Sequence, residues 1–317
     1  MMARLGISLG LLLMCGSLPA AAVDLAVGDV VVLDPSNDVV VRVRPDEYDA
    51  GNPLANQAIV AQGGNIKTPH DVAIGDGELF ITDRSDEVII RVDLATGTQT
   101  LVPLQFSLRP RDIAIDSQGM LVVGDALSFN LVQVDPDTGA VGNLSPSIFL
   151  NTPVYIVLGA GDAIYILEAG QSLQQIDVAQ QTITKVGEGA LGGIALDPAT
   201  GDLFSAGSAD IYRYVPGNYD SGNSTANRTS VFDDNASDVG VLPGGDLVAT
   251  NSANVDLLRI DPATGIGTTV ANGGNLLIPS GLAVVVPEPA VGAAAAVSVA
   301  ALALLCGRRV PAARRQR

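Results

Sequence analysis

Short runs of aliphatic and β-branched residues follow one another along most of the chain, and turn signals separate them. In residues 69–97 an apolar run begins at a proline, a second run ends at an aspartate, and a third leads into Asp-x-x-Thr-Gly. Residues 110–139 repeat this order. Runs bounded by Asp-Pro, Thr-Gly or Gly-Asp turns predict β-strands joined as a meander. No stretch between residues 23 and 286 keeps the period of an amphipathic helix, so we expect an all-β fold.

The meander recurs at a regular interval along the chain. Equivalent apolar positions are 41, 43, 38, 45 and 43 residues apart, and they are Val72, Ile113, Ile156, Ile194, Val239 and Leu282. Four strands in about 42 residues make one blade of a β-propeller.

The two ends of the repeat region complement each other. Residues 28–62 supply the outer strands of a blade without an innermost strand, and residues 279–286 supply an innermost strand with nothing after it. Together they predict a sixth blade, and hence a six-bladed propeller closed by its N- and C-terminal strands, with Leu282 and Val284 in the core between blades. Closure of this kind removes exposed sheet edges.

The sequence of the repeat also points to a family. Pro-x-x-Ile-Ala-Ile, then aliphatic-Thr-Asp, then Arg-Val-Asp-x-x-Thr-Gly resembles NHL-repeat and related lactonase-type six-bladed propellers. The resemblance covers about 255 residues and implies a fold rather than an activity. WD-repeat propellers are disfavoured because the chain contains no tryptophan.

The first 22 residues have the pattern of an export signal. Arg4 precedes an apolar run from Leu5 to Leu18, and small residues stand before a cleavage position after Ala22. A basic start, a short apolar segment and a small-residue cleavage site predict a secretory signal peptide at residues 1–22. The propeller is then expected at residues 23–286.

Residues 287–317 form a tripartite ending. Pro287-Glu288-Pro289 is followed by a charge-free, alanine-rich stretch, residues 290–306, and then by an arginine-rich tail. The apolar stretch is long enough to predict a transmembrane helix with its arginines on the cytoplasmic side. The order resembles the PEP-CTERM sorting signal of Gram-negative bacteria, which implies an exosortase-type membrane protease, the secretion machinery, and transient inner-membrane anchoring before the protein reaches the cell surface or the medium. An ordinary tail anchor is the alternative.

Charge and composition narrow the function. Residues 23–286 contain 33 Asp and Glu against 11 Lys and Arg, a net charge of −22, so nucleic-acid binding is disfavoured. The same residues contain no cysteine and a single histidine, which removes disulfides and multi-histidine metal sites.

Acidic or amide side chains recur where the second strand of a blade ends. They are Asp34, Asp83, Asp125, Glu168 and Asn251, with Gly207 interrupting the series. Such oxygens suit a hard cation such as Ca²⁺. Alternatively, each side chain caps the turn that follows its strand. Their recurrence favours capping, and we predict no other cofactor.

The residues before each innermost strand differ from blade to blade. They include His70, Asp71, Arg111, Asp112, Tyr155 and Asp238, which we expect around one mouth of the central channel as a binding site for a polar ligand. His70 is a candidate base tuned by Asp71 or Asp112. The alternative is that these charges are simply solvated.

Two related loops form a further asymmetry. Residues 48–57 and 219–228 share Tyr-Asp-x-Gly-Asn, and each lengthens the connection between a third and a fourth strand. A tight structural loop is the favoured interpretation, and a weak calcium or sugar contact is the alternative.

The sequence therefore predicts an exported, non-enzymatic propeller that binds or scaffolds extracellular polysaccharide or protein. A secreted lactonase-like, divalent-metal-dependent hydrolase or a lyase is the alternative. Lactonase-type propellers place Glu, Asn and Asp around a channel metal, but no matching Glu opens the first innermost strand here. The lyase type uses several histidines, whereas residues 23–286 contain only His70. We predict no catalytic residue.

Overall fold

The computed structural model describes residues 23–287, except 149, 171, 190, 218, 220–224 and 226. The predicted signal peptide at residues 1–22, Glu288, Pro289 and the apolar segment 290–306 lie outside the described residues. In the part that is described, no helix is long and apolar enough to cross a membrane. The chain divides into two compact units between Val285 and Val286, and the propeller belongs to the first.

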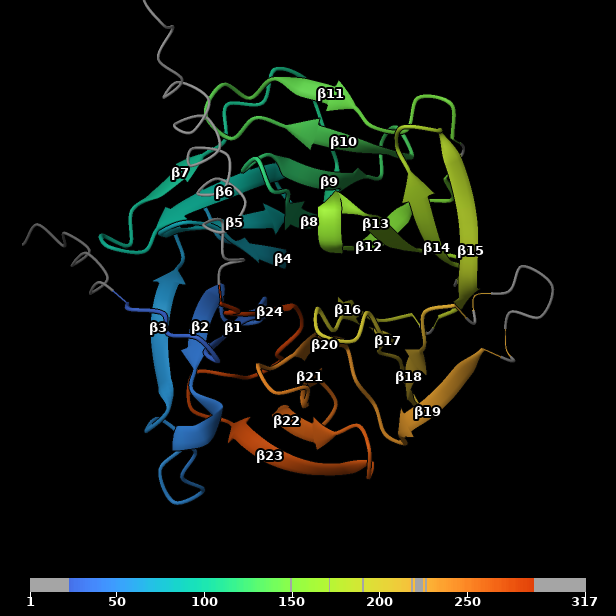
Figure 1. Cartoon of the computed structure of the whole chain (residues 1–317). Helices are drawn as coiled ribbons and strands as arrows, with labels where there is room; N and C mark the ends of the chain where they lie inside the picture. The colour runs from blue at the N-terminus through green and yellow to red at the C-terminus, as the bar shows by residue number, and fades with distance from the viewer. Residues whose placement is uncertain are drawn as a thin grey trace, which may run out of the picture. The chain divides into compact units, whose positions relative to one another are not determined.

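The described residues form six four-stranded antiparallel sheets (Figure 1). From the innermost strand outward, blade 1 consists of β24 (Leu282–Val284), β1 (Val30–Asp34), β2 (Val39–Val43) and β3 (Gln57–Gln62). Blade 2 consists of β4 (Pro69–Ile74), β5 (Glu78–Asp83), β6 (Val88–Asp93) and β7 (Gln99–Leu101). Blade 3 consists of β8 (Pro110–Ile115), β9 (Leu121–Asp125), β10 (Asn130–Val134) and β11 (Val141–Asn143).

The other three blades have the same order. Blade 4 consists of β12 (Pro153–Leu158), β13 (Ile164–Glu168), β14 (Ser172–Asp177) and β15 (Thr182–Glu188). Blade 5 consists of β16 (Ile194–Leu196), β17 (Leu203–Ser205), β18 (Ile211–Tyr214) and β19 (Arg228–Phe232). Blade 6 consists of β20 (Asp238–Val241), β21 (Leu247–Asn251), β22 (Asp256–Asp261) and β23 (Ile266–Asn272). Two short 3₁₀ turns are η1 (Pro45–Glu47) and η2 (Ala160–Asp162).

The innermost strands close a ring. β4 contacts β8, and the contacts continue through β12, β16 and β20 to β24, which in turn contacts β4. The predicted six-bladed, all-β propeller is therefore confirmed.

Blade 1 combines the two ends of the propeller. β24 pairs antiparallel with β1, with Val284 opposite Val30 and Leu282 opposite Val32. Beyond the strand, the N–H of Leu33 donates to Gly281 O at 2.8 Å, and the N–H of Ser280 donates to Leu33 O at 2.9 Å. The predicted closure by the N- and C-terminal strands is therefore confirmed.

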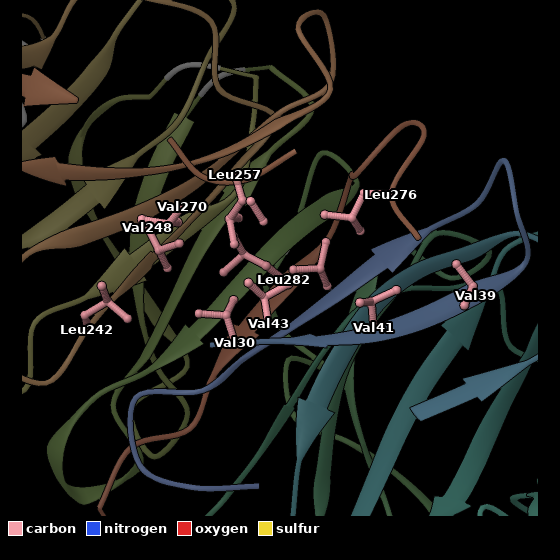
Figure 2. Close-up of a cluster of buried hydrophobic side chains, with 12 residues drawn as sticks. Val30, Val39, Val41, Val43, Leu242, Val248, Leu257, Val270, Leu276 and Leu282 are labelled. Atoms are coloured by element: carbon pink, nitrogen blue, oxygen red, sulfur yellow. The ribbon is translucent and has the colours of Figure 1, made fainter. Parts of the chain in front are cut away.

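The closing strand packs into an apolar cluster between blades 1 and 6 (Figure 2). Leu282 is 6% exposed and lies among residues of β1, β2 and blade 6. Val284 is only partly buried and packs against the cluster. Gly240 of β20 makes room for both, because a Cβ there would lie 2.6 Å from Val284 Cγ2 and 2.8 Å from Leu282 Cδ1. The core position predicted for Leu282 is correct, and that for Val284 is correct only in part.

The acidic residues at the ends of the second strands hold the turns. Asp83 accepts the N–H groups of Lys67 and Thr68, both at 2.8 Å, and also those of Ser85 and Asp86. Burial alone would raise the pKa of Asp83, but these hydrogen bonds outweigh it and lower the pKa. Each carboxylate thus ties the turn after its strand to the segment that leads into the innermost strand.

The other members of the series follow this pattern in whole or in part, through Asp34, Asp125, Glu168 and Asn251. The same kind of contact ties the C-terminal segment to blade 1. The N–H of Ile278, which precedes β24, donates to Oδ2 of Asp34 at 2.7 Å. Backbone donors occupy these oxygens, which supports the capping interpretation over a calcium ring.

The two related loops fasten neighbouring blades together. Asn56 Nδ2 donates to the carbonyl of Val270 in β23 at 2.7 Å, and Asn227 Nδ2 donates to the carbonyl of Val186 in β15. Each asparagine therefore binds the outermost strand of the preceding blade, as the structural interpretation of these loops expects.

Candidate functional site at the channel mouth

The meander brings two sets of loops to one side of the propeller. In an antiparallel blade, the loop leading into the innermost strand and the turn between the second and third strands lie at the same end of the sheet. We call the side formed by these loops the mouth face. The six residues predicted at the channel mouth all lie at or beside the start of an innermost strand, and so belong to this face.

Local irregularities aim some of these side chains. The register of β4 on β5 shifts between Pro69 and Asp71 and leaves His70 outside the ladder. The register of β8 on β9 likewise shifts between Pro110 and Ile113, which releases Arg111. Bulges of this kind redirect a side chain from the regular alternation of a strand. Thr82 Oγ1 fixes the second of them by donating to Arg111 O at 2.8 Å.

The three aspartates of the candidate set join one blade to the next. The N–H of Ile113 donates to Asp71 Oδ2 at 2.9 Å, and the N–H of Leu282 donates to Asp238 Oδ2 at 2.8 Å. The N–H of Ile156 donates to Asp112 Oδ2 in the same way. In each case a carboxyl group at the start of one innermost strand receives a hydrogen bond from the innermost strand of the following blade.

These aspartates also interact with one another. Burial raises the pKa of Asp71 to about 6, although part of the residue keeps solvent contact. Burial and then the charge of Asp71 raise the pKa of Asp112 well above its usual value, and a hydrogen bond joins the two carboxyl groups. Burial followed by the charge of Asp71 does the same to Asp238. Burial and mutual repulsion therefore disfavour the charged forms of these aspartates.

The remaining blades depart from this pattern at the equivalent position, where they have Tyr155, Gly193 and Gly281. Gly193 is required by its neighbour, because a Cβ there would lie 1.5 Å from Asp238 Oδ1. The small residue on one blade thus accommodates the carboxyl group of the next.

The other three candidate residues lie together at the mouth. The rings of His70 and Tyr155 stack with their centroids 6.4 Å apart, although they come from blades 2 and 4. Burial is the largest cause of the shifted pKa of both residues, and the nearby charge of Arg111, from blade 3 between them, acts to lower both pKa values. All three side chains are half-buried. The structure therefore brings His70, Arg111 and Tyr155 together above the aspartate cluster.

His70 lacks the partners of a catalytic base. Burial first, and then the charges of Arg111 and Arg84, lower the pKa of His70 to about 4. Its Nδ1 is buried and has no hydrogen-bond partner among the described residues. A pKa this low makes the neutral ring a weak base, and neither Asp71 nor Asp112 accepts a hydrogen bond that would orient it. In the described part of the chain, no group of three or more His, Cys, Asp or Glu side chains could hold a metal ion.

Sequence reasoning did not identify Arg84. This exposed residue follows Asp83 in the turn after β5, and its N–H donates to Thr68 O at 3.1 Å, just before β4. It lies close enough to lower the pKa of both His70 and Arg111. The sequence feature that could have identified Arg84 is its position directly after the capping residue Asp83. A residue at that position lies in a turn of the mouth face.

Exposed apolar side chains occur in the mouth-face loops as well as elsewhere on the propeller. Phe129 is 52% exposed in the turn between β9 and β10, which also contains Leu127. The segments that lead into β16 and β24 contribute Leu191, Leu277 and Ile278. Phe106 is 66% exposed in the segment that leads into β8, where the N–H of the preceding Gln105 donates to Gly139 O in the turn at the other end of blade 3.

A hollow of about 510 Å³ lies away from the mouth, between blades 3 and 4. Its carboxylates are already occupied within the protein. Asp116 accepts Gln133 Nε2 at 2.6 Å, and Asp162 accepts the hydroxyl of Ser117 at 2.6 Å. The channel mouth is the stronger candidate, because buried polar atoms there lack such partners.

Comparison with known proteins identifies the fold. Neither a known protein family nor a curated protein matches this sequence. Among solved structures, a chain of a nidogen/laminin complex matches with a TM-score of 0.66 at 16% identity, over 81% of this chain and 98% of that chain. A gluconolactonase from Xanthomonas campestris matches with a TM-score of 0.57 at 15% identity, over 84% and 91%. Virginiamycin B lyase from Staphylococcus aureus matches with a TM-score of 0.52 at 16% identity, over 67% and 73%. At these identities the likeness establishes the propeller fold alone.

Proposed function

We propose that this chain is an exported propeller that acts outside the cell as a binding or scaffold module for polysaccharide or protein. The observation that carries the proposal is the mouth face, where Arg84 and Arg111 lie close to the half-buried ring of His70, and Arg111 also lies close to that of Tyr155. A nidogen/laminin complex among the similar structures supports a binding role for this fold. The export part of the proposal rests on the pattern of residues 1–22 and 287–317.

A hydrolase or lyase is the second candidate function. The specific observation in its favour is the likeness in fold to a gluconolactonase and to virginiamycin B lyase. His70 argues against it, because a pKa of about 4 makes the ring a weak base and no carboxylate orients it. Release of product from lactone substrates by purified residues 23–287, together with a divalent metal at full occupancy, would favour the enzyme.

The binding role is tested by retention on extracellular polymer. Purified residues 23–287 are mixed with insoluble polymer from the producing bacterium, and the bound fraction is measured by sedimentation. We expect retention that survives washing. Digestion of the polymer with protease or with glycosidase then distinguishes a protein from a polysaccharide partner. If the propeller stays entirely in the supernatant, the binding role is wrong.

The sorting tail yields a prediction of its own. Since the arginine cluster halts export and leaves Pro287-Glu288-Pro289 at the outer face of the membrane, we expect cleavage near Pro287. Glu288→Ala should trap the full-length protein in the membrane, whereas Glu47→Ala, in an exposed turn of the propeller, should not. Mass spectrometry of the exported protein checks this, and an intact C-terminus at Arg317 would contradict it.

A further inference from the structure

We propose that the channel mouth binds the carboxylate group of a uronic-acid polysaccharide, with Arg84 and Arg111 as its cationic partners and His70 and Tyr155 beside them. This inference rests on the proposed binding function and names the class of ligand that the site takes.

The first argument is the pairing of positive charges in an acidic protein. Seven of the cationic side chains in the described propeller form salt bridges: Arg44, Lys67, Arg91, Arg109, Lys185, Arg213 and Arg259. Arg42 donates to the carbonyl of Asp24, and Arg228 donates to the carbonyl of Glu188 and lies over the ring of Tyr212.

Arg84 and Arg111 are the exceptions within the described propeller, because neither guanidinium has a carboxylate or carbonyl partner there. Residues 23–286 contain 33 acidic side chains, so carboxylates are abundant, yet none reaches these two arginines. Both lie on the mouth face. A free guanidinium pair in a strongly acidic protein is a place where an external anion can bind.

The second argument is the unmet hydrogen-bonding capacity of the mouth. Arg111 Nε and His70 Nδ1 are both buried and have no hydrogen-bond partner in the described chain. Buried polar atoms nearly always have a partner, so these two indicate a missing ligand group or water. Burial first, and then the nearby charge of Arg84, lower the pKa of Arg111, and a bound anion would relieve that crowding.

The buried aspartates beneath the mouth do not supply this anion. Their oxygens receive backbone hydrogen bonds from Ile113, Ile156 and Leu282. Burial also raises the pKa of Asp112 and Asp238 well above the usual range and so disfavours their charged forms, and among the described residues no aspartate of the cluster forms a salt bridge with Arg84 or Arg111. The positive charge of Arg84 and Arg111 is therefore available to a ligand.

The shape of the site favours an acidic sugar. A guanidinium group is planar and matches the two oxygens of a carboxylate. The rings of His70 and Tyr155, whose centroids lie 6.4 Å apart, offer flat surfaces with polar edges beside the arginines. A pyranose ring with a carboxylate substituent presents both features at once.

Calorimetric titration of residues 23–287 with a short oligogalacturonate tests the proposal. The fully methyl-esterified oligomer, inorganic phosphate and a poly-glutamate peptide are the comparison ligands. We expect oligogalacturonate to bind at least about tenfold more tightly than its ester, since the ester lacks the charge that the arginines recognise. Arg84→Gln and Arg111→Gln should each weaken its binding by about tenfold to a hundredfold.

Arg42→Gln is the matched control. It removes the same charge from a side chain that forms no salt bridge and lies on β2, away from the mouth face, so it should leave the affinity unchanged. Arg84 is exposed, so its variant should fold even if the Arg111 variant does not.

Three results would overturn the inference: equal binding of the ester, undiminished binding by the Arg84 variant, or binding of phosphate or poly-glutamate in place of oligogalacturonate. The last would assign the site to a phosphate group or to an acidic protein segment. Retention on extracellular polymer without any binding of oligogalacturonate would contradict this inference alone, whereas loss of retention would contradict the proposed function.

Discussion

Truncation after Gly274 is expected to destabilise the whole propeller. It removes β24 and the segment before it, including Leu276 and Leu282, which are buried in the cluster between blades 1 and 6. Each buried leucine contributes roughly 1.5–3 kcal/mol, and β1 also loses its ladder of backbone hydrogen bonds on one side. The total is comparable to the 5–15 kcal/mol of a typical folded domain. We expect the melting temperature to fall by about 10 °C or more.

Truncation after Pro287 is the control, because it retains β24 and the hydrogen bonds around it. Its melting temperature should equal that of a protein ending further along the chain. Calorimetry of the two truncated proteins checks the prediction. Equal melting temperatures would show that blade 1 does not depend on the C-terminal strand.

Replacement of Asp112 is expected to separate two roles of the aspartate cluster. Asp112→Ala leaves the buried N–H of Ile156 without an acceptor, which costs about 1–3 kcal/mol of unfolding free energy. Asp112→Asn keeps an acceptor for that N–H, can donate to Asp71 and removes a buried ionisable group. The Asn variant should therefore be clearly more stable than the Ala variant at pH 8.

The pH dependence of the Asn variant should also differ from that of the wild type. The folded pKa values of Asp71, Asp112 and Asp238 lie above the reference value of 3.8, so protonation stabilises the folded state, and this contribution is lost as pH rises through the folded pKa values. The cluster should stabilise the wild type increasingly as pH falls from 8 to 6, and the Asn variant should show a smaller gain.

His70 has the opposite sign. Its folded pKa of about 4 lies below the reference value of 6.5, so its contribution is lost as pH falls through 6.5 toward 4, equally in the wild type and in the Asn variant. The other charged or titratable groups around the cluster are Arg84, Arg111 and Tyr155. Denaturant unfolding at pH 8 and pH 6 is the measurement, and identical pH dependence of the wild type and the Asn variant would contradict a raised pKa of the cluster.

The fold was predictable because a propeller repeats the same local pattern. The spacing of apolar positions gave the number of blades, and the unmatched segments 28–62 and 279–286 predicted the closing strand that β24 and β1 form. Val284 is less buried than the strand pattern suggested, and it packs against the cluster. The burial of such a residue depends on how two neighbouring sheets pack. The periodicity of apolar residues along the chain does not describe that packing.

The site was less predictable because its contacts cross from blade to blade. Asp71, Asp112 and Asp238 differ from their counterparts in the other blades and so resembled site residues, yet each binds the backbone of the following blade. The presence of aspartate at the equivalent position of three blades was evidence for this structural role. Gly193 became interpretable only with Asp238 beside it. Arg84 was missed because its turn was assigned to capping alone, while the bulges at His70 and Arg111 bring their side chains close to it.

The most direct test of the mouth face as a binding surface compares three forms of residues 23–287 on the polymer of the producing cells. Wild type, Arg84→Gln and Arg42→Gln are mixed with equal amounts of polymer, and the retained fraction is measured by sedimentation. The wild type and the Arg42 variant should be retained equally, and the apparent affinity of the Arg84 variant should be lower by about tenfold or more. Retention of the Arg84 variant equal to that of the wild type would contradict binding through the channel mouth.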